Sequence, residues 1–357
     1  MSPSQTSKAS LNQVLSVTRT YRSGSLSESL LQLGGTATGW AVLYAVGVYA
    51  AEQRSPWALL VGIAVAAFAL PLFMMQHDCG HHSFFRSRAQ NEWVGFVLGV
   101  ITLTPHQAWY RCHALHHAGS GNLGRRGVGD IRTLTVEEYR RQTPWQRCLY
   151  RLYRNPLVLF GVGPIVLFAV RQRFAFYLPT NWRRERLVTY ATNLCLLAWF
   201  GAVVVFFGVN PYRFLAFHLG SMALAASFGV WLFYVQHQFP DTYWEERHTW
   251  NAADAALLGS SHYDLPQVLR WITADIGLHH IHHLDCSIPN YALLRCFKDN
   301  PPLQQGPRLT FASSLACIRL KLWDQKSRLM VGFDGILESD ARQLPAAAGV
   351  EAEGGAL

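Results

Sequence analysis

The sequence predicts an all-α integral membrane protein in which four transmembrane helices form two hairpins with a cytosolic helical cap. Three observations support this prediction: the composition, the lengths of the apolar runs and the distribution of arginine between them. Half of the 357 residues are hydrophobic, 15% are charged and 13% are aromatic, which is too apolar for most soluble domains. The net charge of +9 is therefore assigned to cytosolic loops, and a nucleic-acid partner is not expected.

The chain is predicted to have three parts. Residues 1–33 are rich in Ser, Thr and Gln and are interpreted as a cytosolic N-terminal lead-in, because no apolar run with a small-residue cleavage site follows closely. The membrane domain is predicted to cover residues 34–335. Residues 336–357 are predicted to form a low-complexity C-terminal tail.

Four apolar runs are long enough to cross a hydrocarbon core, which requires roughly 20 helical residues. The short connections "EQRSP" and "VNPYR" join these runs in pairs, so each pair is predicted to cross the membrane and return. The predicted spans are approximately residues 35–51, 57–75, 187–208 and 214–235.

Two further apolar runs, residues 94–105 and 156–170, are shorter, and the second is interrupted by Gly and Pro. Loop charge decides whether they cross. With four spans, nearly all Arg residues lie on the side of the N-terminus, and each opposite turn carries one Arg. This asymmetry follows the positive-inside rule, and it would be lost if one of the shorter runs crossed. Both runs are therefore predicted to be interfacial or re-entrant helices.

Histidine is concentrated in segments that this topology places at one membrane boundary. The segment "HDCGHHSFF" spaces two histidines four residues apart, about one helical turn. The segments "WYRCHALHHAGSGN" and "GLHHIHHLD" each contain an H-x-x-H-H pattern, whose members share a helical face. A further histidine follows the fourth span in "VQHQFPDTYW". The predicted metal ligands are His77, His81, His113, His116, His117, His237, His279, His282 and His283.

Nine imidazoles are more than one ion requires, so the site is predicted to hold two metal ions. Zinc hydrolysis is disfavoured, because it usually uses about three protein ligands and a Glu base, whereas Asp78 occupies that position here. A bis-histidine haem would need only two imidazoles. Redox-active iron beside apolar hairpins instead indicates oxygen activation against a hydrocarbon chain drawn from the lipid.

The remaining histidines are given structural interpretations. His82 and His280 adjoin predicted ligands but face the other side of their helices, so they are expected to support the ligands or to be solvated. Asp275 precedes His279 by four residues, and on a continuous helix its carboxylate would orient that imidazole through a hydrogen bond; a solvated Asp is the alternative. Four isolated histidines are interpreted as solvated or core residues: His106, His218, His248 and His262.

The order of these motifs on a four-span chain resembles the membrane-bound fatty acid desaturase family, and in particular the bacterial omega-6 (Δ12) acyl desaturases. The resemblance extends from about residue 71 to residue 333. It is strengthened by "QHQFPDTYW", "GSSHYDLP", "GLHHIHHLD" running into "IPNYAL", and "LACIRLKLWD". The chain departs from the family at His82, where relatives often have Gly, and at Asp275, where many have Asn.

The resemblance implies a histidine-bound di-iron centre that uses O2 and two electrons to introduce a cis double bond into an acyl chain. It implies that the eight histidines of the three boxes bind the two iron ions and that His237 is an additional ligand. No catalytic residue beyond the di-iron centre is implied. The expected substrate is an oleoyl-type acyl chain, and the expected location is a bacterial inner membrane with the site on the cytosolic side.

Electrons are expected from an external donor, because no haem or flavin segment is visible in the chain. In the family this donor is typically a ferredoxin or a small haem protein. An acidic carrier would be attracted to a group of cap arginines, although these residues would equally serve to fix topology or to contact anionic lipid. The group comprises Arg125, Arg126, Arg140 and Arg141.

Three alternatives remain open at the level of sequence. A related di-iron fatty acyl hydroxylase would share the metal site, and a desaturase of other regiospecificity would share the motifs. A metal-binding or metal-transporting membrane protein is the alternative from a different class. It is disfavoured because a transporter is expected to place polar ligands near the middle of its spans, where only His218 lies.

Overall fold

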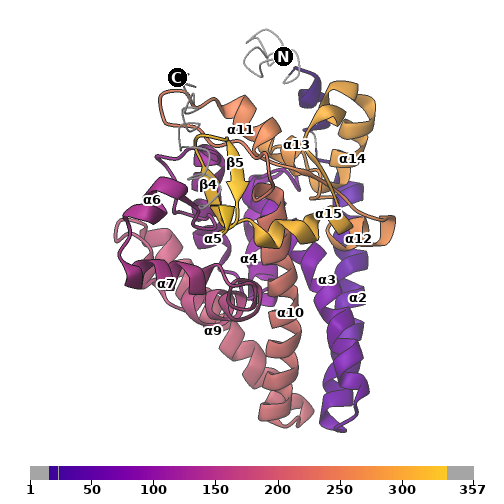
Figure 1. Ribbon diagram of the computed structural model, residues 1–357. Helices are drawn as coiled ribbons and strands as arrows, with labels where there is room; N and C mark the ends of the chain where they lie inside the picture. Colours follow the sequence, from indigo (N-terminus) through magenta and orange to yellow (C-terminus); the bar gives the residue numbers. More distant parts are fainter. Residues whose placement is uncertain (1–15, 23, 336–357) are drawn as a thin grey trace, which may run out of the picture.

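The computed structural model describes residues 16–22 and 24–335, and the fold is mainly helical (Figure 1). The predicted tail, and residues 1–15 and 23 of the predicted lead-in, lie outside the described residues. Four long helices form two antiparallel hairpins whose turns lie at the same end of the molecule, and the shorter elements gather at the other end (Figure 1). These helices are α2 (Leu26–Glu52), α3 (Trp57–Gly80), α9 (Arg183–Phe207) and α10 (Pro211–His237).

Within the described residues, α3, α9 and α10 are long and apolar enough to cross a membrane. Helix α2, which contains the first predicted span, does not meet the same criterion. Polar and aromatic side chains such as Thr36, Trp40 and Tyr44 lower its hydropathy, and these three are buried in the bundle. The structure therefore supports three spans directly, and the four-span topology stays a prediction.

The turn end of the bundle is held by local caps and one ion pair. Gly208 ends α9 with a φ of +62°, a left-handed conformation that glycine adopts at low cost. Asn210 caps α10, because its Oδ1 accepts the N–H groups of Tyr212 at 3.1 Å and Arg213 at 3.2 Å. Arg213 also forms a 2.8 Å ion pair with Glu52 at the end of α2. This ion pair links the two hairpins.

The interior of the bundle is rich in aromatic side chains. Tyr44 of α2 stacks on Trp40 with ring centroids 4.7 Å apart and lies against Trp199 of α9 and Phe214 of α10. Its hydroxyl lies 2.9 Å from Nδ1 of His218. His218 is fully buried in this aromatic cluster, as expected of a core histidine.

The two shorter apolar runs take different forms. Residues 94–105 lie mostly in α4 (Arg88–Ile101), which packs on α3. Residues 156–170 form the π-helical turns η2 (Val158–Val162) and η3 (Val166–Val170) on either side of α8 (Gly163–Ile165). Together with α7 (Pro144–Tyr153) they make a pair bent by 59°, which fits either a broken span or a re-entrant loop. That both runs stay at the interface remains a prediction.

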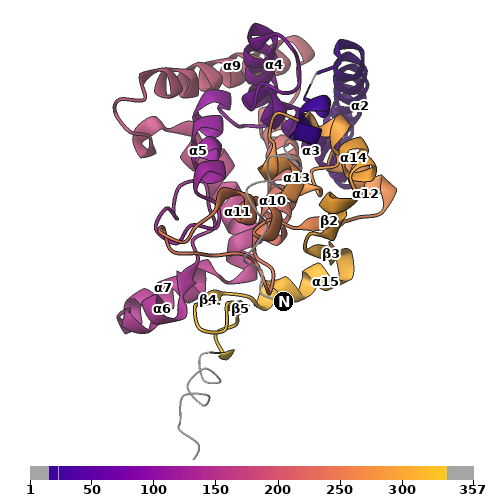
Figure 2. The ribbon, with the colours of Figure 1, turned by 90° about the horizontal axis from the view of Figure 1, so that it is seen from above.

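The elements at the other end of the hairpins form what we call the cap. Figure 2 shows α13 and α10 near the middle of the molecule in the view from above, with α3 and α5 beside them. The cap helices are α5 (His106–Gly119), α6 (Val136–Arg141), α11 (Ala252–Leu258), α12 (Gln267–Ile272), α13 (His279–Leu284), α14 (Asn290–Asp299) and α15 (Phe311–Ala316). Short 3-10 turns are η1 (Arg19–Tyr21), η4 (Arg171–Arg173), η5 (Ala175–Tyr177), η6 (Pro301–Gln305) and η7 (Cys317–Arg319).

Two small sheets tie distant parts of the cap together. Strand β4 (Leu322–Asp324) pairs in parallel with β1 (Leu134–Thr135) and in antiparallel with β5 (Leu329–Val331). Strand β2 (His262–Asp264) pairs in parallel with β3 (Arg308–Thr310). Strands β2 and β3 lie before and after α13 in the sequence, so their pairing closes the segment that carries α13. This arrangement restricts the position of the third histidine motif.

Candidate metal centre

The nine predicted ligands come from four helices that converge where the hairpins meet the cap. His77 lies in the last turn of α3, and His81 directly follows that helix while its backbone N–H still bonds to the His77 carbonyl at 3.2 Å. Helix α5 carries the second motif, α13 the third, and His237 is the last residue of α10. All nine side chains are brought together, in two separate groups.

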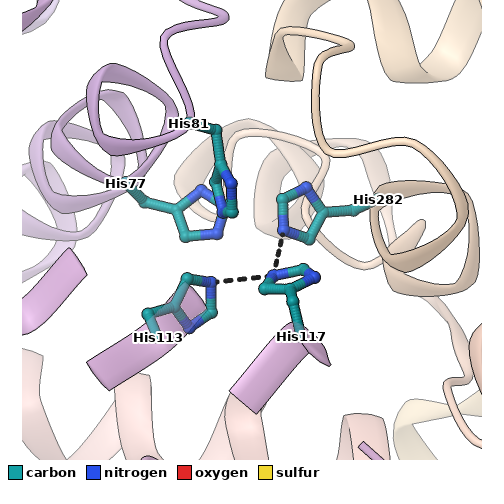
Figure 3. Close-up of side chains that lie close together, drawn as sticks. All are labelled: His77, His81, His113, His117 and His282. Atoms are coloured by element: carbon teal, nitrogen blue, oxygen red, sulfur yellow. Dashed lines mark hydrogen bonds between the residues drawn. The ribbon is translucent and has the colours of Figure 1, made fainter. Parts of the chain in front are cut away.

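The first cluster contains five histidines, one nitrogen from each lying within 4.8 Å of the others. Figure 3 shows their rings facing a common centre from three helical segments. Nε2 of His117 lies 3.0 Å from Nε2 of His113 and 3.1 Å from Nε2 of His282 (Figure 3). The members of the first cluster are His77, His81, His113, His117 and His282.

The second cluster contains His116, His237, His279 and His283, again with one nitrogen each within 4.8 Å. Nε2 of His237 lies 3.2 Å from that of His116 and 3.0 Å from that of His279. The clusters adjoin, because the rings of His117 and His283 stack with centroids 4.1 Å apart. A cavity of ≈ 20 Å³ borders the second cluster and is lined in part by His116, His237, Asp130, Gln238 and Thr242.

Each H-x-x-H-H motif is divided between the two clusters. In α5 the outer pair, His113 and His117, joins the first cluster while His116 joins the second. In α13 the outer pair, His279 and His283, joins the second cluster while His282 joins the first. Positions i+3 and i+4 of a helix differ by about 100° in direction, so neighbouring histidines face different centres. The spacing predicted a shared helical face and two ions, but it did not predict how each motif is divided between the two clusters.

Two carboxylates and one carbonyl hold the outward nitrogens of cluster histidines, and sequence analysis assigned none of them this role. His77 Nδ1 donates to Asp78 Oδ1 at 2.9 Å, and His116 Nδ1 donates to Asp130 Oδ1. His237 Nδ1 donates to the Gly259 carbonyl at 3.0 Å. Such bonds leave Nε2 unprotonated and directed at the centre, as metal ligation requires. A carboxylate adjacent to a predicted ligand, as in "HD", is the one available sequence signal.

Six cluster imidazoles outside the spanning helices have a lowered pKa. Burial, followed by the proximity of other imidazoles, lowers their pKa well below the ordinary value of 6.5. This holds for His81, His113, His117, His279, His282 and His283. Neutral imidazole is the form that binds a metal ion, so the site is ready for ligation at neutral pH.

The donor set fits metal ions of the kind that prefer imidazole. Two groups of imidazole nitrogens converge without any carboxylate inside either group. His81 Nε2 is buried within the first cluster and has no hydrogen-bond partner among the described residues. A buried donor or acceptor without a partner costs free energy unless a ligand satisfies it. Imidazole suits zinc, copper, iron and nickel, so the chemistry of the donors admits iron.

Aromatic side chains form an apolar wall beside the two clusters. Trp109 stacks on His113 with centroids 4.6 Å apart and an interplanar angle of 17°. Phe73 of α3 lies 5.0 Å from Trp109 in an edge-to-face contact, and Phe168 lies 6.4 Å from Phe73. On the second cluster, Phe233 lies 5.0 Å from His116. His113 of the first cluster and His116 of the second therefore each lie against an aromatic side chain.

Histidines outside the predicted ligand set lie outside both clusters. His82 has a φ of +56° and its Nε2 lies 3.9 Å from a Glu92 carboxylate oxygen. His280 is fully buried and turned away, donating from Nε2 to the Leu303 carbonyl at 2.8 Å, so it is not solvated. His106 is buried, His262 is half-buried and His248 is exposed, and none belongs to a cluster.

The predicted role of Asp275 is wrong. Helix α12 ends at Ile272, and Asp275 lies in a turn with a φ of +54°, so no continuous helix joins it to His279. Its Oδ1 instead accepts a hydrogen bond from Arg270 Nε at 2.7 Å. Within the described residues, Nδ1 of His279 is buried without a hydrogen-bond partner.

Comparison with known proteins gives the same family as the motifs. The sequence profile of the fatty acid desaturase family, described as "Fatty acid desaturase", matches residues 54–312. The chain is 39% identical over 308 residues to the fatty acid desaturase of Bacillus subtilis (strain 168), and the aligned region covers 86% of each chain. It is also 27% identical over 263 residues to an sn-1 oleoyl-lipid 12-desaturase of Picosynechococcus sp., covering 72% of this chain and 73% of the relative.

A further relative carries its electron donor in its name. The chain is 29% identical over 246 residues to the "sn-1 acyl-lipid omega-3 desaturase (ferredoxin)" of Synechocystis sp., covering 65% of this chain and 64% of the relative. The resemblance seen in the histidine motifs is confirmed by the family match over most of the chain. The chain therefore belongs to the fatty acid desaturase family, whose members are oxidoreductases that act on acyl lipids.

Proposed function

We propose that this protein is a di-iron acyl-lipid desaturase that uses O2 and two electrons to introduce a cis double bond at Δ12 into an oleoyl-type chain. The observation that carries the proposal is the pair of adjacent histidine clusters beside an apolar aromatic wall. In the proposal, the first cluster would hold one iron and the second cluster the other. When bound, the iron pair supplies the O2 chemistry needed to remove hydrogens from unactivated methylenes.

The residues of the chain would position the substrate and protect the site. Methylenes offer no polar group to bind, so an acyl chain must be placed by shape and apolar contact. Phe73, Trp109 and Phe233 provide such contact next to histidines of both clusters. Asp78 and Asp130 hold His77 and His116 in the orientation that keeps their Nε2 atoms available. These hydrogen bonds hold the two rings rigidly. A metal site requires such fixed ligand positions.

The choice of Δ12 and an oleoyl-type substrate rests on relatives. The Picosynechococcus relative is named an sn-1 oleoyl-lipid 12-desaturase, and proteins of that name also occur in Anabaena variabilis and Synechocystis sp.. The omega-3 desaturase relative shows that regiochemistry differs between proteins that match this chain to a similar degree. Product analysis is therefore the decisive measurement.

The proposed topology has α2 as a fourth span in the inner membrane of a bacterium, with the clusters on the cytosolic side. Helix α2 has 27 residues and so is about 40 Å long, enough to cross a hydrocarbon core of about 30 Å. Its exposed side is apolar, with Leu31 at 77% and Val42 at 58% exposure. Arginines concentrated on the cap side support a cytosolic cap, because positive loops stay in the cytosol.

An external donor, a ferredoxin or a small haem protein, would supply the electrons. Support comes from the relative whose name includes ferredoxin. Of the cap arginines, Arg126 forms two hydrogen bonds with Glu138 at 2.6 and 2.9 Å, and Arg141 pairs with Glu137 at 2.7 Å. These ion pairs reduce the positive charge available to an acidic carrier, so Arg125 carries more of that proposed role.

The experiment is expression of the full chain, with a ferredoxin and its reductase, in a host whose lipids contain oleate but no polyunsaturated chains. Fatty acids are then analysed by mass spectrometry with location of the double bonds. We expect a Δ9,Δ12 diene with the intact chain and none with His282→Ala. A hydroxylated product, a diene at another position or unchanged lipids would contradict the corresponding part of the proposal.

A further inference from the structure

Asp78, the acceptor for His77, is held by an asparagine from a distant part of the chain. Asp78 Oδ2 accepts two hydrogen bonds from Asn290, one from its backbone N–H at 2.7 Å and one from its side-chain Nδ2 at 2.9 Å. Asp78 and Asn290 are each 1% exposed and His77 is 3% exposed. The carboxylate thus bridges the first cluster and the start of α14 in a water-excluded position.

The hydrogen bond between His77 and Asp78 restricts the Asp78 side chain, because Asp78 directly follows the histidine that it holds. Successive side chains on a helix point about 100° apart, so the carboxylate reaches the His77 ring only in a restricted set of rotamers. Within the described residues, no Arg or Lys forms an ion pair with Asp78. The Asn290 donors are therefore the interactions that hold the second carboxylate oxygen and, with it, the direction of the first.

Asn290 is itself held in place from both sides. It is the first residue of α14, where a backbone N–H has no acceptor inside the helix, and the Asp78 carboxylate fills that role. Its Oδ1 accepts a hydrogen bond from Gln32 Nε2 of α2 at 2.6 Å. The amide orientation follows from these partners: Oδ1 faces Gln32 and Nδ2 faces Asp78. A chain of hydrogen bonds runs from α2 through α14 to the first cluster.

The second cluster lacks an equivalent arrangement. Asp130 accepts from His116, but within the described residues no amide or cation bonds to the Asp130 carboxylate. The Asp130 side chain is 11% exposed, against 2% for Asp78. The difference indicates that Asn290 serves the first cluster specifically rather than the metal centre in general.

We propose that Asn290 is a positioning residue for the first cluster: acting through Asp78, it fixes the His77 ring with Nδ1 protonated and Nε2 directed at the metal position. This inference rests on the proposed function, since it assumes that the first cluster binds iron. It also gives a role to the "IPNYAL" segment, which contains Asn290. Partners that orient a ligating histidine typically affect metal affinity by roughly 10- to 100-fold.

The test measures iron rather than turnover. Purified full-length protein is stripped of metal, titrated with iron(II) without oxygen, and examined by Mössbauer spectroscopy after loading with the 57Fe isotope. We expect Asn290→Ala to weaken one of two iron sites about tenfold and to alter one iron signal only. Asp78→Asn should weaken the same site, and adding Asn290→Ala to it should cause no further loss, because both act along one path.

Asn300→Ala is the matched control, because Asn300 lies at the other end of α14 and donates to the Cys296 carbonyl at 2.7 Å. It should leave both iron sites unchanged. Thermal unfolding of the metal-free proteins separates orientation from folding. Asn290→Ala should melt somewhat below the control, because Gln32 and Asp78 lose a buried partner, but its loss of iron should still be confined to one site. Three results would overturn the inference. Asn290→Ala could bind iron at both sites with wild-type affinity, or the losses could be additive in the double variant. Asn290→Ala could also lose both irons equally and melt at a lower temperature. A wild-type protein that binds no iron would instead overturn the proposed function.

Discussion

The first and second clusters share α5 and α13 but differ in their third source of ligands and in their surroundings. The first takes two histidines from the end of α3, whereas the second takes only His237 from α10. Asp78, the carboxylate beside the first cluster, accepts two hydrogen bonds from Asn290. Asp130, the carboxylate beside the second cluster, lies on a loop next to a cavity of ≈ 20 Å³. Such a cavity has room for a water molecule.

One motif thus contributes ligands to two unlike sites. The outer pair of each H-x-x-H-H motif serves one cluster and the inner histidine serves the other, in opposite order on the two helices. The first cluster contains five histidines. The second contains four and borders a cavity that is lined in part by polar side chains. We therefore expect the first cluster to depend more strongly on its supporting residues.

The largest effect should come from removing one ligand of either cluster. His113→Ala and His116→Ala lie on the same helix but belong to different clusters, so they are a matched pair. Each should reduce desaturation by at least about 100-fold, because both ions are needed and a truncated ligand leaves an open coordination position. Metal analysis should show iron lost from a different site in each variant. His248→Ala, at an exposed position, should be unaffected. Activity above a tenth of wild type in either cluster variant would show that the two clusters do not work together.

A smaller and unequal effect is expected from the two carboxylates. Asp78→Asn should weaken iron binding toward the upper end of the ~10- to 100-fold range, and Asp130→Asn toward the lower end. The reason is burial: Asp78 is enclosed, and its replacement brings an amide N–H against the donors of Asn290. Anaerobic iron(II) titration of each variant measures the difference. Equal losses of iron affinity would show that the hydrogen bonds from Asn290 do not make Asp78 more important than Asp130.

Acid should destabilise the metal-free protein through both clusters. Burial, followed by neighbouring imidazoles, lowers the pKa of His113 and His282 in the first cluster and of His279 and His283 in the second well below 6.5. Below pH 6.5 the unfolded chain binds protons that the folded site does not, so stability falls as pH falls. The slope is at most about 1.4 kcal/mol per pH unit for each histidine. Melting temperatures at pH 7.5 and 5.5 measure the loss.

The cluster variants show which site carries this pH dependence. Replacing His282 or His283 with Gln should make the pH dependence shallower, since each variant removes one proton acceptor of the unfolded chain. His248→Gln, at an exposed position, provides the control. A melting temperature that rises on acidification would mean that the imidazoles are not held neutral.

The smallest effect should come from Asp275→Ala. The carboxylate bonds to Arg270 in a partly exposed ion pair with side-chain exposures of 25% and 30%, and such pairs contribute about 0–1 kcal/mol. Iron content should match wild type and activity should stay within about twofold. A selective loss of iron from the second cluster would restore a link from Asp275 to His279 that the turn at residue 275 excludes.

Several features could be predicted because they depend on residues close in sequence. The apolar runs predicted helices where α3, α9 and α10 lie, and these helices meet the criterion for spanning a membrane. The i, i+3 and i+4 spacing selected eight of the nine histidines that the structure brings together, and the position after the fourth span selected His237. Helical periodicity operates over one or two turns, so a pattern of that length contains the necessary information.

Other features depended on the path of the chain between elements. The Asp275 prediction assumed a continuous helix, but positive φ values at Ala274 and Asp275 turn the chain before α13 begins. Helix α2 was predicted as a span from its apolar run, but Trp40 and Tyr44 lower its hydropathy, and the structure buries both in the bundle. Turn conformation and helix contacts are not encoded in residue spacing.

The sequence alone predicted the histidines at helical spacing, the apolar helices and the family to which the chain belongs. Only the tertiary structure decided that these histidines form two clusters, that each motif is divided between them, and that Asn290 holds the carboxylate beside His77. The physical reason is that ligation depends on where side chains from different helices meet. Such meetings are set by the packing of α3, α5, α10, α13 and α14, not by any one of their sequences.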